Sequence, residues 1–353
     1  MLVAWPGWAG SWQQAVTSRF ATEFDTNPAM SPMYPGGVRR NVFAPGYTLA
    51  GKVGESEIKT GLAFQFARSS DKNLSPDSDS PSVYIDWMRP SDAGEFGISS
   101  RYTEIATRDA GVDATGLVPA DSIRTSRALS GRWSNAMSER SSLSANGTYE
   151  RVLYKGSNLV DYVTRTGDAT LSYSWSDHSS SFLRMSYAEY KPLGGNFLSR
   201  FANAIYGLNW NPSDYLEFSL QMGKTKVSGQ PMGTQGGGAM RYTGQRTQLS
   251  LNADRQLSPG GMGGFVKADQ MRASWNYALG DHSNAGFDFS WHKNLSILQN
   301  NIRTSTRVWL QHNLNPSWMV RANYMRTVVQ GGGTGSVSSN ILGLSLVYSY
   351  SDF

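Results

Sequence analysis

Apolar and polar residues alternate with a period of two along most of the chain. Segment 216–222 reads Leu-Glu-Phe-Ser-Leu-Gln-Met, and segments 58–66 and 342–350 show the same alternation. Successive side chains of a β-strand point to opposite faces, so each segment predicts a strand with one apolar and one polar face. The polar faces carry charged residues in mid-strand through the whole chain, Glu217 among them.

The connections between these segments alternate in length. Short turns are predicted near 52–55, 90–94, 135–139, 176–179, 211–214, 279–283 and 314–317. Longer, polar, Gly-rich connections are predicted near 26–37, 69–80, 108–121, 229–240 and 330–337. A soluble sandwich also has two-faced strands, but short connections on one side and long ones on the other are typical of an outer-membrane barrel.

Tryptophans favour the same interpretation, because indole prefers the boundary between membrane and water. Seven of them lie at or near the expected strand ends: Trp87, Trp133, Trp175, Trp210, Trp275, Trp291 and Trp318. The alternative is that these are core aromatics of a sandwich.

The predicted fold is all-β: a closed antiparallel transmembrane β-barrel of 16–18 strands, with 18 favoured. An even number places both termini on the periplasmic side. Segment 229–265 resists pairing, and we expect one short, irregular strand there, within Gln235–Tyr242. Residues 11–353 form a single barrel domain. Residues 1–10, MLVAWPGWAG, are either the remnant of a secretory signal or a loose N-terminus.

Composition removes several other classes of protein. The chain has 353 residues, 17 % of them charged, and no cysteine, which excludes disulfide scaffolds and Cys-ligated metals. Mean hydropathy is −0.41, and no apolar run reaches the roughly 18 residues of a membrane helix. The net charge of +5 is spread along the chain, so we expect no nucleic-acid partner.

No motif in the sequence supports a catalytic, metal or cofactor site. Asp71, Asp77 and Asp79 lack the glycine and the closing glutamate of a calcium loop, and a solvated acidic loop is expected there. Asp288 and His292 share a strand face but would lie about 13 Å apart. We therefore expect no enzyme activity and no cofactor.

Short motifs give the chain a family resemblance. The opening Phe20-Ala-Thr-Glu-Phe-Asp-Thr-Asn-Pro28, together with segments 246–251, 258–261 and 266–269, resembles the β-barrel porins encoded with exopolysaccharide export systems. The resemblance implies an outer-membrane barrel that works with periplasmic polysaccharide assembly machinery, and it supplies no catalytic residues. The C-terminus resembles the assembly signal of such barrels, although Phe353 is one residue out of phase with Tyr350, an offset that a bulge could absorb.

The polar strand faces are expected to line the interior of the barrel. The predicted pore-lining residues are Arg19, Glu23, Lys59, Gln65, Arg184, Glu217, Gln221, Asn252, Asp254, Arg272, Asn276 and Arg321. These side chains suit a hydrated passage, or alternatively salt bridges that fill and rigidify the barrel.

The expected function is a conduit for secreted exopolysaccharide in the outer membrane. Its partners would be outer-membrane lipid, the polysaccharide and a periplasmic export protein. The alternatives are a general porin for small solutes and a plugged barrel that acts as a surface scaffold or adhesin. Inward folding of the Gly-rich segment 229–240 would favour plugging.

Overall fold

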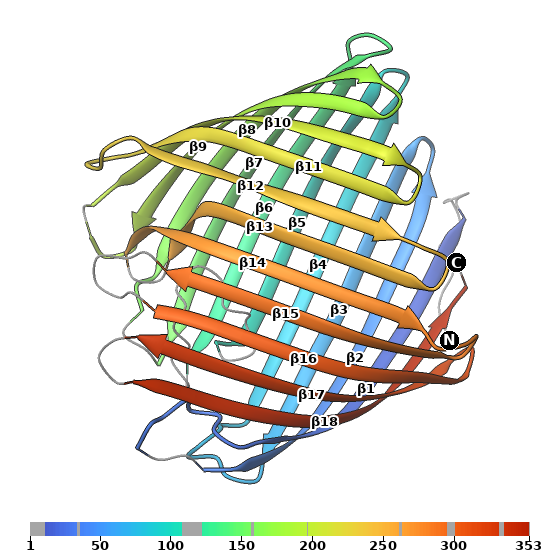
Figure 1. Cartoon of the computed structure of the whole chain (residues 1–353), viewed down its shortest axis with the longest axis vertical. Coiled ribbons are helices and arrows are strands. Elements are labelled where there is room, and N and C mark those ends of the chain that lie inside the picture. Colours follow the sequence, from blue (N-terminus) through green and yellow to red (C-terminus); the bar gives the residue numbers. More distant parts are fainter. Residues whose placement is uncertain are drawn as a thin grey trace.

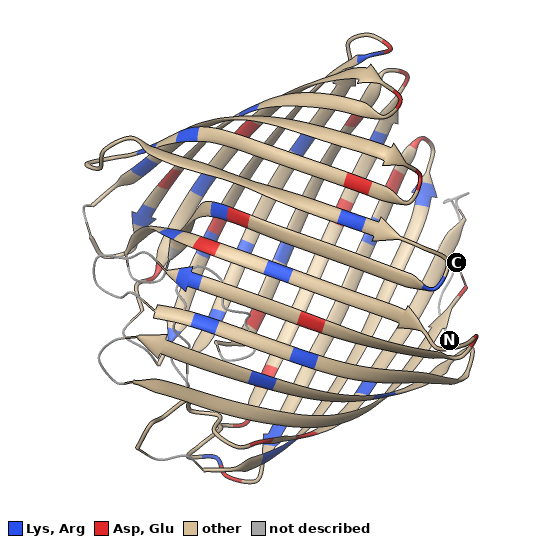
Figure 2. Cartoon of the chain, viewed as in Figure 1, with Lys and Arg blue, Asp and Glu red and all other residues tan. Residues whose placement is uncertain are grey.

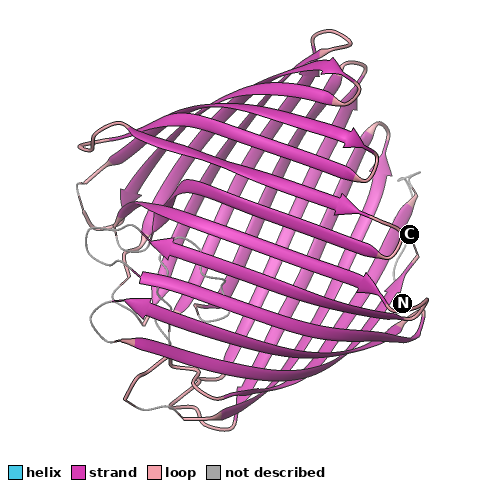
Figure 3. Cartoon of the chain, in the orientation of Figure 1, coloured by secondary structure: helices cyan, strands magenta, loops and turns pink. Residues whose placement is uncertain are grey.

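The structure is a computed structural model that describes residues 11–33, 36–107, 122–156, 159–195, 197–260, 263–294, 301–331 and 335–352. Its elements are all strands (Figure 3). They are β1 (Trp12–Asp25), β2 (Val38–Val53), β3 (Ser56–Ser69), β4 (Ser78–Ser91), β5 (Gly94–Ala106), β6 (Ile123–Ala136), β7 (Ser141–Lys155), β8 (Tyr162–Ser176), β9 (Ser179–Pro192), β10 (Ser199–Ser213), β11 (Leu216–Val227), β12 (Gly233–Thr243), β13 (Thr247–Gly260), β14 (Gly264–Ala278), β15 (Ser283–Asn294), β16 (Asn301–Asn315), β17 (Trp318–Gly331) and β18 (Ser336–Ser351). No helix in these ranges is long and apolar enough to cross a membrane.

The strands form one closed antiparallel barrel of 18 strands, the fold and the favoured strand number predicted from the sequence (Figure 1). Each strand pairs with its neighbours in sequence, and β1 closes the ring against β18 from Ala15↔Ser351 to Asp25↔Ile341. The shortest strand is β12, with 11 residues, and it lies where the sequence predicts a short strand. The long connection expected at 229–240 is wrong, because strand pairing begins at Gly233.

The two ends of the barrel differ. Both termini and the short turns lie at one end, and the longer connections lie at the other (Figure 1). We call these the turn end and the loop end. Residues 1–10, all of 108–121 and Phe353 fall outside the described residues, so the interpretations of the N-terminus, of the long connection at 108–121 and of the last residue stay predictions.

The outer face of the barrel is apolar and exposed. Phe20, Leu220 and Leu342 are 48 %, 65 % and 63 % exposed, whereas their sequence neighbours on the inner face are polar or small, apart from Ile341. Exposed apolar surface on this scale is unfavourable in water, and it suits a lipid environment.

Most of the tryptophans singled out in the sequence lie on this apolar outer face. By strand register, Trp87, Trp133, Trp175, Trp210, Trp275 and Trp318 all face outward near the turn end, and Trp175 is 59 % exposed. Trp291 differs, because it lies close to the loop end of β15. An interior sandwich core is therefore excluded for the exposed members of this set.

Introducing a charge on the outer face of β11 tests this assignment of faces. Leu220 lies between Phe218 and Met222 on that face, whereas the adjacent Gln221 faces inward. We expect Leu220→Arg to lower the free energy of unfolding in phosphatidylcholine vesicles by about 2–4 kcal/mol. Gln221→Arg should change it little, and equal losses in denaturant titrations of the two variants would refute the assignment.

Candidate functional site

The tip of the β13–β14 hairpin leaves the barrel wall and folds inward. β13 pairs with β12 only up to Arg255, and β14 pairs with β15 only from Ala268. The described residues of this hairpin tip, 256–260 and 263–267, therefore have ladder partners only within their own hairpin. This tip contacts β9 and β10, which are not its neighbours in the ring.

Aromatic side chains hold the hairpin tip against the far wall. The ring of Phe265 packs edge-on against Phe201, with centroids 4.9 Å apart, and against Tyr190 at 6.0 Å. Tyr190 is fully buried, stacks on Tyr162 at 4.8 Å and is hydrogen-bonded by the backbone of Gly263 and Gly264. Both glycines have positive φ, 95° and 150°, which L side chains rarely adopt.

This hairpin corrects the expected position of an inward segment. The sequence singles out the Gly-rich segment 229–240, but most of that segment forms β12 in the wall. The described residues that enter the lumen are 256–260 and 263–267, and their aromatic anchor has no local signal in the sequence because its partners lie on β8, β9 and β10.

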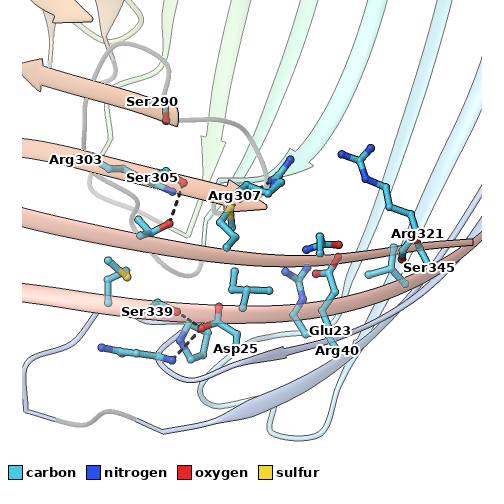
Figure 4. Close-up of a pocket in the computed structure, with 18 of the residues that line it drawn as sticks. Glu23, Asp25, Arg40, Ser290, Arg303, Ser305, Arg307, Arg321, Ser339 and Ser345 are labelled. Atoms are coloured by element: carbon cyan, nitrogen blue, oxygen red, sulfur yellow. Dashed lines mark hydrogen bonds between the residues drawn. The ribbon is translucent and has the colours of Figure 1, made fainter. Parts of the chain in front are cut away.

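A cavity of about 700 Å³ lies in the lumen against the wall formed by β14–β18 and β1–β3. We call it the arginine cavity because six arginines line it and only two carboxylates, Glu23 and Asp25, accompany them (Figure 4). The arginines are Arg19, Arg40, Arg272, Arg303, Arg307 and Arg321. The cavity therefore carries a net positive charge.

Among the residues that the structure describes, Arg272, Arg307 and Arg321 have no carboxylate partner within ion-pair distance. Arg19 pairs with Glu23 at 2.9 Å. Within the described ranges, however, Arg272 donates to the amide oxygen of Gln270 at 3.1 Å and Arg307 contacts the Met325 sulfur at 3.3 Å. Donors that are held in place without a neutralising acid remain available to an anionic ligand.

Arg321 is positioned by an aromatic ring. Its guanidinium carbon lies 4.3 Å from the ring centroid of Trp309, which donates its indole N–H to Asp288 at 3.2 Å. Stacking fixes the plane of a guanidinium while leaving its N–H donors directed outward. Trp309 thus orients Arg321 toward the cavity without neutralising it.

A second cavity of about 710 Å³ adjoins the first along β11 and β13–β17. The two share Gln270, Arg272, Ser290, Ser305, Arg307 and Met325. Gln270 also donates to Asp254 at 2.8 Å. The two cavities therefore lie side by side in this half of the barrel, and polar side chains make up most of their shared lining.

The predicted pore-lining residues all fall on inward-facing strand positions, but only some meet in these cavities. Arg19, Glu23, Gln65, Arg272 and Arg321 line the arginine cavity. Gln221, Asn252 and Asp254 line the second one. Lys59, Arg184, Glu217 and Asn276 lie on the inner face away from both, and solute contact for the whole set stays a prediction.

The sequence analysis missed Arg40, Arg303, Arg307 and Trp309. The alternation of Arg303, Ser305, Arg307 and Trp309 along one face of β16 was a usable signal. The residues on the opposite face of β16, Thr304, Thr306 and Val308, are only weakly apolar. The alternation of polar and apolar residues is therefore weaker in this strand than in the others.

The acidic loop between β3 and β4 is a structural turn. Asp71 Oδ1 accepts the backbone N–H of Asn73, and Asp77 accepts that of Ser69. The Ser69 N–H and the Lys72 ammonium, 2.9 Å away, hold the pKa of Asp77 below its ordinary value. The described residues contain no group of three or more His, Asp or Glu that could hold a metal ion.

Solved structures with the same fold include outer-membrane proteins. The outer membrane protein OpdK of Pseudomonas aeruginosa superposes with a TM-score of 0.55 at 10 % identity, over 97 % of this chain and 99 % of its own. OccK2 (OpdF) of the same organism, in complex with glucuronate, gives 0.55 at 10 % identity over 97 % and 98 %. OccAB4 of Acinetobacter baumannii gives 0.54 at 10 % identity over 96 % and 98 %.

These likenesses establish the barrel fold. The sequence matches no family model and no curated protein. The structural neighbours support an outer-membrane type of barrel but give no support to the association with exopolysaccharide export.

Removing the aromatic anchor tests the inward hairpin. We expect Phe265→Ala to raise single-channel conductance in planar bilayers, because the tip loses its packing on Phe201 and Tyr190. Phe218→Ala is the matched control, since Phe218 stacks on Trp210 on the outer face, at 5.7 Å. Unchanged conductance in Phe265→Ala would show that the tip does not restrict the lumen.

Proposed function

We propose that the chain forms an outer-membrane channel for small anionic solutes. The observation that carries this proposal is the arginine cavity, in which six arginines face two carboxylates in a space of about 700 Å³. Ligand sites for small molecules have volumes of roughly 300–1,000 Å³, so the cavity suits a solute the size of a sugar acid.

The physical chemistry of the site favours carboxylates. Arg272, Arg307 and Arg321 come from three strands and direct their guanidinium groups into one space. A planar guanidinium binds a carboxylate through two parallel hydrogen bonds, and flanking amides such as Gln270 suit hydroxyl groups. One structural neighbour, OccK2, was solved in complex with glucuronate, a ligand of this chemical class.

The membrane placement belongs to the same proposal. The exposed apolar outer face and the closed hydrogen-bonding ring are what a lipid bilayer requires. Both termini lie at the turn end (Figure 1), and we place that end in the periplasm because barrels of this type have short periplasmic turns.

The exopolysaccharide conduit is less well supported. A polymer would have to pass the hairpin tip 256–267, which reaches across to β9 and β10. This function needs the tip displaced and a periplasmic export protein to deliver the chain. A plugged scaffold is the third candidate, and it would insert into bilayers without conducting.

Ion selectivity tests the proposed function. We expect the wild-type channel to prefer chloride over potassium in reversal-potential measurements, and glucuronate to block the current. Removing Arg321 and Arg307 together should weaken block at least about tenfold, since a hydrogen bond to a charged group contributes roughly 1.5–3 kcal/mol.

The matched control is Arg326→Gln on the same strand. Arg326 is exposed and opposite Asn340 on the outer face, five residues along β17 from the inward Arg321. It should leave selectivity and block unchanged. A cation-selective wild type, or block that is insensitive to Arg321→Gln/Arg307→Gln, would refute an anion channel.

A further inference from the structure

An arc of arginines lies on the outer face of the barrel near its loop end. Arg127, Arg151, Arg165 and Arg200 belong to β6, β7, β8 and β10 and are all exposed. The strand register places Arg127 directly opposite Arg151, and places Glu189 of β9 opposite both Arg165 and Arg200. We call these four arginines the arginine arc.

We call the apolar outer face of the barrel the apolar belt. The arc lies at the edge of this belt that is nearer the loop end. On the same face, the next residue toward the turn end is Leu129 beside Arg127 on β6, Tyr149 beside Arg151 on β7 and Tyr187 beside Glu189 on β9. These three side chains are 53 %, 43 % and 46 % exposed. Tyrosine marks the interface between hydrocarbon and headgroups, so the guanidinium groups sit at headgroup level.

The protein neutralises the arc only in part, because Glu189 pairs with Arg200 and lies opposite Arg165, and Glu104 accepts a hydrogen bond from Tyr102. Arg200 pairs with Glu189 at 3.1 Å. Across the described parts of the chain, no carboxylate lies within ion-pair distance of Arg127, Arg151 or Arg165, and Arg127 instead stacks at 5.8 Å over Tyr102. Like charges directly opposite on adjacent strands destabilise a sheet, and a bound anion would relieve the repulsion between Arg127 and Arg151.

The same end of the barrel is balanced elsewhere. Arg255 on β13 makes two hydrogen bonds to Asp269, at 2.5 and 2.8 Å, and Arg68 pairs with Asp79 at 2.6 Å. Figure 2 shows blue and red bands side by side at the left end of β13 and β14. Arg255 and Arg68 thus differ from Arg127, Arg151 and Arg165, for which the described residues supply no ion pair.

We propose that the arginine arc binds the phosphate groups of a lipid whose headgroup is a bisphosphorylated disaccharide. This inference rests on the proposed placement in an outer membrane. Arg127 and Arg165 are two strands apart, about 10 Å at roughly 4.8 Å per strand, so the arc spans both ends of such a headgroup. Each guanidinium can hold a phosphate through two hydrogen bonds, and clustered basic residues beside a membrane attract anionic lipid.

Native mass spectrometry of the detergent-solubilised barrel tests the proposal, with diphosphoryl lipid A as the probe. We expect the wild type to retain one lipid adduct. The triple variant Arg127→Gln/Arg151→Gln/Arg165→Gln should bind it at least about tenfold more weakly, given the loss of several charged hydrogen bonds. Monophosphoryl lipid A should bind more weakly than the diphosphoryl form to the wild type.

Arg255→Gln is the matched control, because this outward arginine is already satisfied by Asp269, and its lipid binding should equal that of the wild type. Equal retention by the triple variant and the wild type would overturn the proposal, as would equal retention of phosphatidylcholine. Displacement by millimolar inorganic phosphate alone would indicate an unspecific anion site and would also overturn it.

A second measurement separates this inference from the proposed function. Conductance and anion selectivity in pure phosphatidylcholine bilayers depend on the lumen and not on the arc, so the triple variant should match the wild type there. If both fail to conduct yet the wild type retains lipid A, the channel proposal fails and the lipid site stands. Circular dichroism of the triple variant confirms that it is folded.

Discussion

The structure depends on one requirement, which is that every strand must have a partner on both edges. The pairing of β1 with β18 meets it by closing the ring, and a closed ring leaves no free strand edge in a hydrocarbon environment. Once the ring is closed, the period-two alternation sorts all side chains into an outer and an inner set. The apolar belt and the charged lumen are therefore two consequences of the same backbone geometry.

The hairpin tip 256–267 departs from this rule. It gives up ladder hydrogen bonds to β12 and β15, and the packing of Phe265 on Phe201 and Tyr190 compensates inside the lumen. The inward hairpin matters for the proposed channel, because a barrel of 18 strands without such a segment is wide enough to hold bulk water. With the tip folded in, the remaining space is divided into cavities whose size suits a solute.

The sequence predicts those features that follow from local alternation and misses those that depend on contacts across the barrel. The inward positions of Arg19 and Arg321 follow from alternation, the strand number from the chain length, and the short strand β12 from the need for an even number of strands. The glycines of segment 229–240 suggest a loop in the sequence, but most of them lie in a strand of the wall. An added Cβ at Gly236 or Gly237 would come within 2.7 Å of a carbonyl oxygen on the neighbouring strand, so the close approach of the strands favours glycine at both positions. The arginine cavity could not be assembled from the sequence, since its members come from strands whose mutual distances alternation does not specify.

The two arginine clusters show how one residue type serves two environments. A shift of one position along a strand moves a side chain from the lumen to the lipid face. Arg321 and Arg326, five positions apart on β17, accordingly face opposite sides. Inside, Trp309 orients Arg321 toward the solute space, while outside, Tyr102 supports Arg127 at the edge of the apolar belt. In both places an aromatic ring positions a guanidinium without neutralising it, which is consistent with our two proposals that each cluster binds an anion, one in the lumen and one in the membrane.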